Sequence, residues 1–258
     1  MTAPAWDPAW DDPLSRSVDA LTEQLRTLRF ELNFTDASTI RFSGSLVPEP
    51  GTELASYLRK PSAATFDTPA TFQAADSYTL FNLPSDTQLK RLLLKQLERR
   101  NIPLYVQECV MRSNGKALLS EQRSTGLLKF SMELENGAMK PILAAMKNEK
   151  TIQQLPSGLW MLDCGENNRT IYAELRENKF LLAAGNLTEQ TARRLLDDPT
   201  PLPPQVEPGT SALSHYRKGK DGTVIRKGEL RLTARELLFS FQLSASDFPQ
   251  KPVQIPGN

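Results

Sequence analysis

The sequence predicts an α+β fold in which antiparallel sheets carry helices packed on one face. A strand-turn-strand-helix pattern occurs twice, over residues 30–60 and 170–198, and each copy has alternating apolar residues before a short helix. Apolar residues make up 39% and charged residues 24% of the 258 residues, which is typical of a globular protein with a buried core. We therefore expect two related units rather than a solenoid, which needs more repeats.

The chain is predicted to begin with an extended, proline-rich arm, followed by an amphipathic helix. Spacings of four and three define one apolar helix face, made of Leu14, Val18, Leu21, Leu25 and Leu28. Because this stripe is too apolar to face water, we expect it to dock on the chain's own sheet or, alternatively, on a second copy. The candidate partner-binding residues are Trp6 and Trp10 in the arm and Leu21 and Leu25 on the stripe.

The first unit continues with a hairpin. Phe30, Leu32 and Phe34 alternate with polar residues, as do Ile40 and Phe42, which predicts two strands with one buried face. A short helix capped by Thr52, a strand over 77–84 and a long helix over 86–101 are expected to follow.

The second unit is predicted to contain five strands and two helices. The strands are expected over 104–112, 126–137, 158–165, 169–176 and 179–185, and the helices over 138–150 and 187–198. Pro141 fits the first helix only in its first turn, and Thr188 is positioned to cap the second. Cys109 and Cys164 fall in predicted strands and are interpreted as two buried thiols, whereas a disulfide between them would need adjacent strands and an oxidising compartment.

Composition divides the chain into five segments. The stretch 198–209 has five prolines among twelve residues, which favours an extended linker. The predicted segments are an N-terminal arm (1–12), a first α+β unit (13–101), a second unit (102–198), a proline-rich linker (199–210) and C-terminal strands that complete the sheet (211–258).

The residues that follow each hairpin do not suit a cofactor or a nucleic acid. Gly44, Gly51 and Gly185 are isolated, and acidic residues stand at the helix starts, where they would repel phosphate. Thirty-one basic residues balance thirty acidic ones, so no field attracts nucleic acid, and the stretch from Tyr216 to Lys220 is interpreted as a solvated loop. We expect no cofactor and no membrane span.

The sequence offers no recognisable catalytic constellation. His215 is the only histidine and is interpreted as a surface residue in a loop. Glu133, Glu135 and Glu174 are interpreted as the wet side of half-buried strands. Two carboxylates can hydrolyse a glycan without any sequence motif, so a hydrolase remains the alternative to a non-catalytic protein.

The succession "ELNFTD…TIRFSG…PGTELASYLRKP", with "ADSYTLFNLP" and later "ELRENKFLLAAGNLTEQTARRLLDD", resembles an uncharacterised family of bacterial envelope proteins. The resemblance covers most of the chain after residue 28 and rests on pattern. It implies repeated hairpin-helix units, a periplasmic or lipid-anchored location and no catalytic residue. The start lacks a secretory signal and a lipid-attachment cysteine, so we expect an anchor or signal upstream or, alternatively, a cytoplasmic protein. The expected function is a scaffold or protein-binding module for another envelope protein, as a monomer or weak homodimer.

Overall fold

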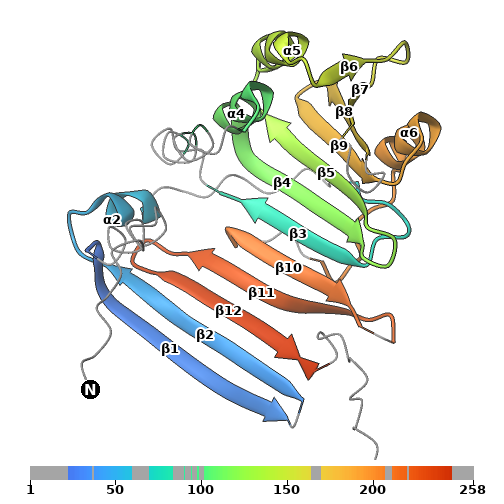
Figure 1. Ribbon diagram of the computed structural model, residues 1–258. Coiled ribbons are helices and arrows are strands. Elements are labelled where there is room, and N and C mark those ends of the chain that lie inside the picture. Colours follow the sequence, from blue (N-terminus) through green and yellow to red (C-terminus); the bar gives the residue numbers. More distant parts are fainter. Residues whose placement is uncertain are drawn as a thin grey trace, which may run out of the picture.

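The computed structural model describes residues 23–36, 38–59, 70–83, 90, 94, 98, 102–163, 170–206, 211–219 and 221–245. Within these residues, twelve strands form one sheet that is accompanied by four helices (Figure 1). The strands are β1 (Leu25–Asp36), β2 (Thr39–Pro48), β3 (Ser77–Asn82), β4 (Ser113–Gln122), β5 (Leu127–Leu134), β6 (Ile152–Gln154), β7 (Trp160–Asp163), β8 (Thr170–Arg176), β9 (Lys179–Gly185), β10 (Leu213–Lys218), β11 (Val224–Leu232) and β12 (Leu237–Ser244). The helices are α2 (Glu53–Leu58), α4 (Leu104–Met111), α5 (Met139–Asn148) and α6 (Glu189–Asp197).

The sheet interleaves distant parts of the chain. Its order is β1-β2-β12-β11-β10-β3-β4-β5-β9-β8-β7-β6, and its neighbouring strands pair antiparallel. The last three strands therefore lie between the first hairpin and β3. The predicted segments 13–101, 102–198 and 211–258 all contribute strands to this one sheet. The division of the chain into domains stays a prediction.

Several local signals in the sequence have the predicted structural effect. Thr52 caps α2 and Thr188 caps α6, since each hydroxyl accepts a hydrogen bond from a backbone N–H in the first turn. Pro141 lies in the first turn of α5, where its missing N–H breaks no helical hydrogen bond. Of the predicted helix over 86–101, residues 90, 94 and 98 are described and are helical.

Two predictions of strand and helix are wrong. Residues 104–112, predicted as a strand, contain the helix α4, because Tyr105 and Cys109 lie four residues apart and are both buried on one helix face. Residues 113–122 then form the strand β4. The predicted first helix cannot extend to Leu28, because β1 begins at Leu25, opposite Pro48 of β2. The rest of that predicted helix lies outside the described residues.

The helices cover both faces of the sheet, so the prediction that they pack on one face is wrong. Leu181 and Ala183 of β9 share a buried cluster with Leu195 of α6. Phe180 and Leu182, which alternate with them, belong to a second cluster with residues of α4 and α5. Successive strand residues point to opposite faces, and a strand that is apolar on both sides is covered on both sides.

The helices of both clusters pack on the half of the sheet that contains β4, β5, β9 and β8, and the first cluster extends from there to Leu80 of β3 and Tyr216 of β10. Figure 1 shows α4, α5 and α6 around this half, whereas α2 lies at one end of β1 and β2. None of the helices in the described segments has the length and apolar content needed to cross a lipid bilayer.

Candidate functional site

One face of the strands β1, β2 and β12 is apolar. The cross-strand register places its side chains in rows, in which Phe42 lies opposite both Leu32 of β1 and Phe241 of β12. Residues that lie directly opposite each other share a face of the sheet. We call this surface the apolar face; its side chains are Leu28, Phe30, Leu32, Phe34, Ile40, Phe42, Leu46, Leu237, Phe239, Phe241 and Leu243.

Much of the apolar face is open to solvent. Phe30 is 60% exposed, Leu32 is 55% exposed and Phe34 is 70% exposed. The hairpin forms as predicted, but the prediction that its apolar face is buried is wrong within the described residues. Burial requires a covering layer, and the described helices α4, α5 and α6 pack against the other half of the sheet (Figure 1).

Three phenylalanines form an aromatic cluster on this face. The ring centroid of Phe30 lies 5.5 Å from that of Phe42 and 5.8 Å from that of Phe239, and the last two lie 5.6 Å apart. Gly44 makes this cluster possible, because a Cβ there would lie 2.6 Å from Phe239 Cζ and 2.1 Å from the Arg29 carbonyl oxygen. The absence of a side chain at Gly44 therefore leaves room for the ring of Phe239, so this glycine has a structural role in the packing of the face.

The opposite face of the same hairpin is polar. Arg29, Glu31 and Asn33 of β1 alternate with the apolar side chains and are exposed. Arg29 lies opposite Ser45 and Glu31 lies opposite Ser43 of β2. The sheet is thus amphipathic in this region, with one wet face and one exposed apolar face.

The residues that the sequence nominated for partner binding are not on the exposed patch. Trp6, Trp10 and Leu21 lie outside the described residues. Leu25 begins β1, is half-buried and lies opposite Pro48. The exposed phenylalanines were placed correctly in a hairpin by their alternation, but the sequence carries no sign that they remain uncovered.

His215 and Tyr216 belong to the strand β10, which corrects the prediction of a surface loop. The hydroxyl of Thr79 lies 2.9 Å from Nδ1 of the half-buried His215. Tyr216 is buried, and its hydroxyl accepts a hydrogen bond from Arg226 Nε at 3.0 Å. In the described part of this stretch, Tyr216 is buried in the core, whereas Arg217 and Lys218 are half-buried; Lys220 lies outside the described residues.

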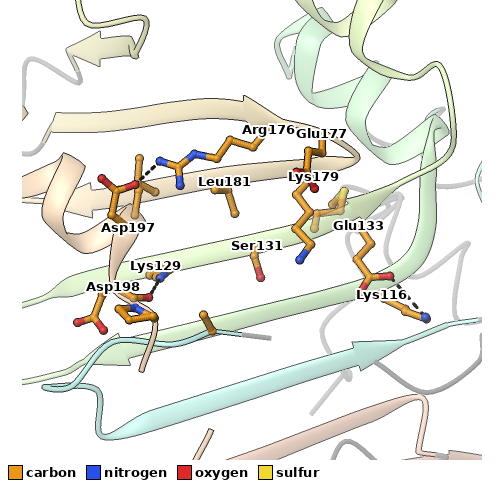
Figure 2. Close-up of a pocket in the computed structure, with 14 residues that line it drawn as sticks. Lys116, Lys129, Ser131, Glu133, Arg176, Glu177, Lys179, Leu181, Asp197 and Asp198 are labelled. Atoms are coloured by element: carbon orange, nitrogen blue, oxygen red, sulfur yellow. Dashed lines mark hydrogen bonds and ion pairs between the residues drawn. The ribbon is translucent and has the colours of Figure 1, made fainter. Parts of the chain in front are cut away.

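A polar pocket of about 330 Å³ lies on the far half of the sheet (Figure 2). Its lining comes from β4, β5, β9, the end of β8 and the end of α6. Figure 2 shows Lys129 beside Asp198 at one end, and Glu133 with Lys116 at the other. This pocket is the second candidate site. Its charged side chains could act on a ligand only if they are not already bound by other groups of the protein.

Lys129 is a buried cation held by two backbone carbonyl groups. Its side chain lies within the core at 3% exposure, and Nζ donates to the carbonyl oxygens of Thr71 at 3.0 Å and Asp198 at 2.8 Å. Burial lowers the pKa of Lys129 from 10.5 to about 8, and the charges of Asp198 and Asp197 only partly oppose this shift. These contacts bind the segments at 71 and 198 to the sheet, which gives Lys129 a structural role.

Glu133, Asp197 and Asp198, three of the carboxylates that line the pocket, are bound by cations or by hydrogen-bond donors. Glu133 lies 3.4 Å from Lys116 Nζ, and Arg176 bridges Glu174 and Asp197. Burial alone would raise the pKa of Asp198, but hydrogen bonds from Thr200 hold it below its ordinary value. Asp198 is therefore ionised near neutral pH and unsuited to be a proton donor, which in a glycosidase needs a raised pKa.

The other two acids considered from the sequence are also in ion pairs. Glu135 Oε1 lies 2.7 Å from Lys90 Nζ, and Glu174 Oε1 lies 2.7 Å from Arg193 Nη1. Within the described residues, no group of three or more histidine, cysteine, aspartate or glutamate side chains could hold a metal ion. The three acids considered from the sequence, Glu133, Glu135 and Glu174, are thus all in ion pairs.

Comparison with known proteins does not assign the chain to a family. No protein-family model and no curated protein matches the chain. Among solved structures, crystal forms III, IV and I of TP0453 are similar, with TM-scores of 0.42, 0.39 and 0.39 and sequence identities of 11%, 10% and 11%. The matches cover 70%, 70% and 71% of this chain and 95% of each TP0453 chain.

Proposed function

We propose that the protein is a non-catalytic binding module of the bacterial cell envelope, and that its apolar face receives another envelope protein. The observation that carries this proposal is the contiguous, exposed cluster around Phe30 and Phe42. Large exposed apolar patches on folded proteins mark interaction sites. Complete burial of one such side chain contributes about 1.5–3 kcal/mol, so covering the row from Leu28 to Phe34 contributes substantially to the free energy of binding.

The geometry also favours binding because the aromatic rings are held in place before a partner arrives. Phe30, Phe42 and Phe239 already contact one another across three strands. Aromatic side chains have few rotatable bonds, and rigid elements lose little entropy on binding. A partner therefore binds a surface whose aromatic side chains are already ordered.

The non-catalytic assignment is supported by the state of the candidate acids and of Lys129. Each carboxylate considered for hydrolysis is bound by a cation, and the carboxyl pKa that does shift at the pocket, that of Asp198, is lowered. Lys129 binds two backbone carbonyl oxygens. The envelope location rests on the sequence resemblance, and fractionation of cells with an antibody against the protein tests it: recovery with cytoplasmic markers would refute it.

Site-specific photo-crosslinking tests the binding role. A photo-reactive phenylalanine analogue is placed at Phe34, which is 70% exposed on the apolar face, or at the neighbouring Asn33 on the polar face. We expect a discrete adduct with a different protein in cells at position 34, and no adduct with a different protein at position 33. The double variant Phe30→Ser, Phe42→Ser should abolish the adduct.

Two results would contradict the proposal. Equal adducts at both positions would indicate random collision rather than a binding face. An internal cross-link from position 34 to the N-terminal residues 1–22, found by mass spectrometry of the monomer, would show that the chain covers its own apolar face.

A further inference from the structure

The strand β1 is a long and open edge of the sheet. It has twelve residues, and among the described strands only β2 pairs with it. The opposite edge, β6, has three residues. Proteins usually protect sheet edges by shortness, proline, bulges or charge, because an edge strand presents unpaired backbone groups that can bind another strand. β6 is protected by its short length. β1 has register shifts near both of its ends, between Leu25 and Thr27 and between Phe34 and Asp36, and the stretch from Thr27 to Phe34 pairs with β2 without a bulge.

The side chains of β1 make it complementary to a second copy of itself. Arg29 and Glu31 flank Phe30, and all three are exposed. In an antiparallel pair with Phe30 opposite its own copy, Arg29 of each chain lies opposite Glu31 of the other. Opposite charges at such positions stabilise a strand pair.

Neighbouring registers lack this complementarity. A shift by one residue places the apolar side chains of one copy on the polar face of the other. A shift by two residues places Arg29 opposite Arg29 in one direction, or Glu31 opposite Glu31 in the other, and like charges directly opposite are destabilising. Charge and face alternation therefore select the same register.

We propose that the protein forms a two-fold symmetric homodimer by antiparallel pairing of β1 with β1 of a second copy, in the register that places Phe30 opposite Phe30. The pairing joins the two sheets into one and places Leu28 of each copy opposite Leu32 of the other, so the apolar face continues across the dimer. This inference uses the edge of the sheet, whereas the proposed function uses its apolar face, so each can fail without the other.

Charge exchange tests both the dimer and its register. The molecular mass of the full chain is measured by sedimentation equilibrium over a range of concentrations, for wild type, R29E, E31R and the double variant R29E/E31R. Each single change converts two attractive pairs into two repulsive pairs, and we expect it to weaken dimerisation about tenfold or more. The double variant restores both attractive pairs and should restore the dimer.

The controls separate this effect from folding and from net charge. R29E and E31R change the net charge in opposite directions, so loss of the dimer in both excludes a general charge effect. R41E places the same change as R29E on β2, one strand away from the edge, and should dimerise like wild type. Circular dichroism spectra should be unchanged in all variants, since these side chains are exposed. Melting temperatures are compared at a concentration at which every variant is monomeric, because dimerisation itself raises the melting temperature.

Three results would overturn the inference: a monomeric wild type at its highest soluble concentration, a dimer that is insensitive to the single changes, or a double variant that stays monomeric. The arginine and glutamate changes leave the apolar face intact. Adducts from position 34 with a different protein should therefore persist in R29E, and their loss would bear on the proposed function instead.

Discussion

Lys129 should make the stability of this protein depend on pH in the alkaline range. The pKa of Lys129 is about 8 in the folded protein, below the ordinary value of 10.5 that applies when the chain unfolds. Between these values the unfolded chain binds more protons than the folded one, so the free energy of unfolding rises as pH increases through this window. At one pKa unit per 1.36 kcal/mol, the charged form of the folded side chain costs about 3 kcal/mol relative to its neutral form.

The perturbation is Lys129→Met, which keeps the length of the side chain and removes its charge. It also removes the donor for the carbonyl oxygens of Thr71 and Asp198, and an unsatisfied buried acceptor costs about 1–3 kcal/mol. K129M is therefore not expected to be more stable at neutral pH. Its distinguishing property is the loss of the pH dependence that the lysine causes.

The assay is urea unfolding at pH 7 and pH 9.5, followed by the fluorescence of the buried Trp160. Between these pH values, the unfolding free energy of wild type should rise by about 2 kcal/mol relative to that of K129M, because other titrating groups affect both proteins equally. Lys140→Met, at an exposed position of α5, is the matched control and should behave as wild type. Parallel pH profiles for wild type and K129M would refute the buried-cation reasoning.

Three further predictions follow from single residues. Gly44→Ala should lower the free energy of unfolding by about 1–3 kcal/mol in urea titrations, because the added Cβ overlaps the Arg29 carbonyl and Phe239, whereas Ser43→Ala should have little effect. Thr188→Ala should cost about 1 kcal/mol in thermal unfolding through loss of the α6 cap, and Thr188→Ser should retain it. Burial and, to a lesser extent, the charge of Glu108 raise the pKa of Cys109 to about 12, so in a Cys164→Ser background its alkylation by iodoacetamide at pH 8 should be about a thousandfold slower in the folded protein than in urea, and equal rates would contradict its burial.

Features determined within a few residues could be predicted from the sequence. The caps at Thr52 and Thr188 and the position of Pro141 depend on local backbone hydrogen bonds, and the structure confirms all three. The alternation of Phe30, Leu32 and Phe34 likewise identified a hairpin. Each of these signals concerns one element and its immediate neighbours.

Features that depend on distant contacts were not predictable in the same way. Residues 104–112 contain residues that favour strands, yet they form a helix because Tyr105 and Cys109 pack in a cluster with residues of α5. Lys129 lies in a strand whose sequence predicts one exposed face. Its burial is caused by the chain segments around Thr71 and Asp198, whose carbonyl oxygens accept hydrogen bonds from it. One signal was available for the two-sided core: the unbroken apolar run in β9 is typical of a strand covered on both faces.

The exposure of the apolar face, like these features, could not be predicted from local sequence. Alternation places Phe30, Phe34 and Phe42 on one face, but whether that face is covered depends on where the helices pack. The apolar residues alone favour burial, because most such faces in globular proteins are buried. Only the three-dimensional arrangement shows that the described helices leave this face exposed.

The position of β10, β11 and β12 has a consequence for biosynthesis. Leu46 of β2 lies opposite Leu237 of β12, so among the described strands the hairpin is joined to the sheet only through strands that are synthesised much later than the hairpin itself. Contacts between residues so far apart in sequence slow folding, because a long loop must close before they form. Until then the hairpin exposes aromatic residues and unpaired strand edges to other nascent chains. We therefore expect chaperones that prevent aggregation to bind it during synthesis. A chain that stops before β10 would leave the hairpin without its neighbouring strand, so premature termination should yield an aggregating fragment rather than a smaller folded protein.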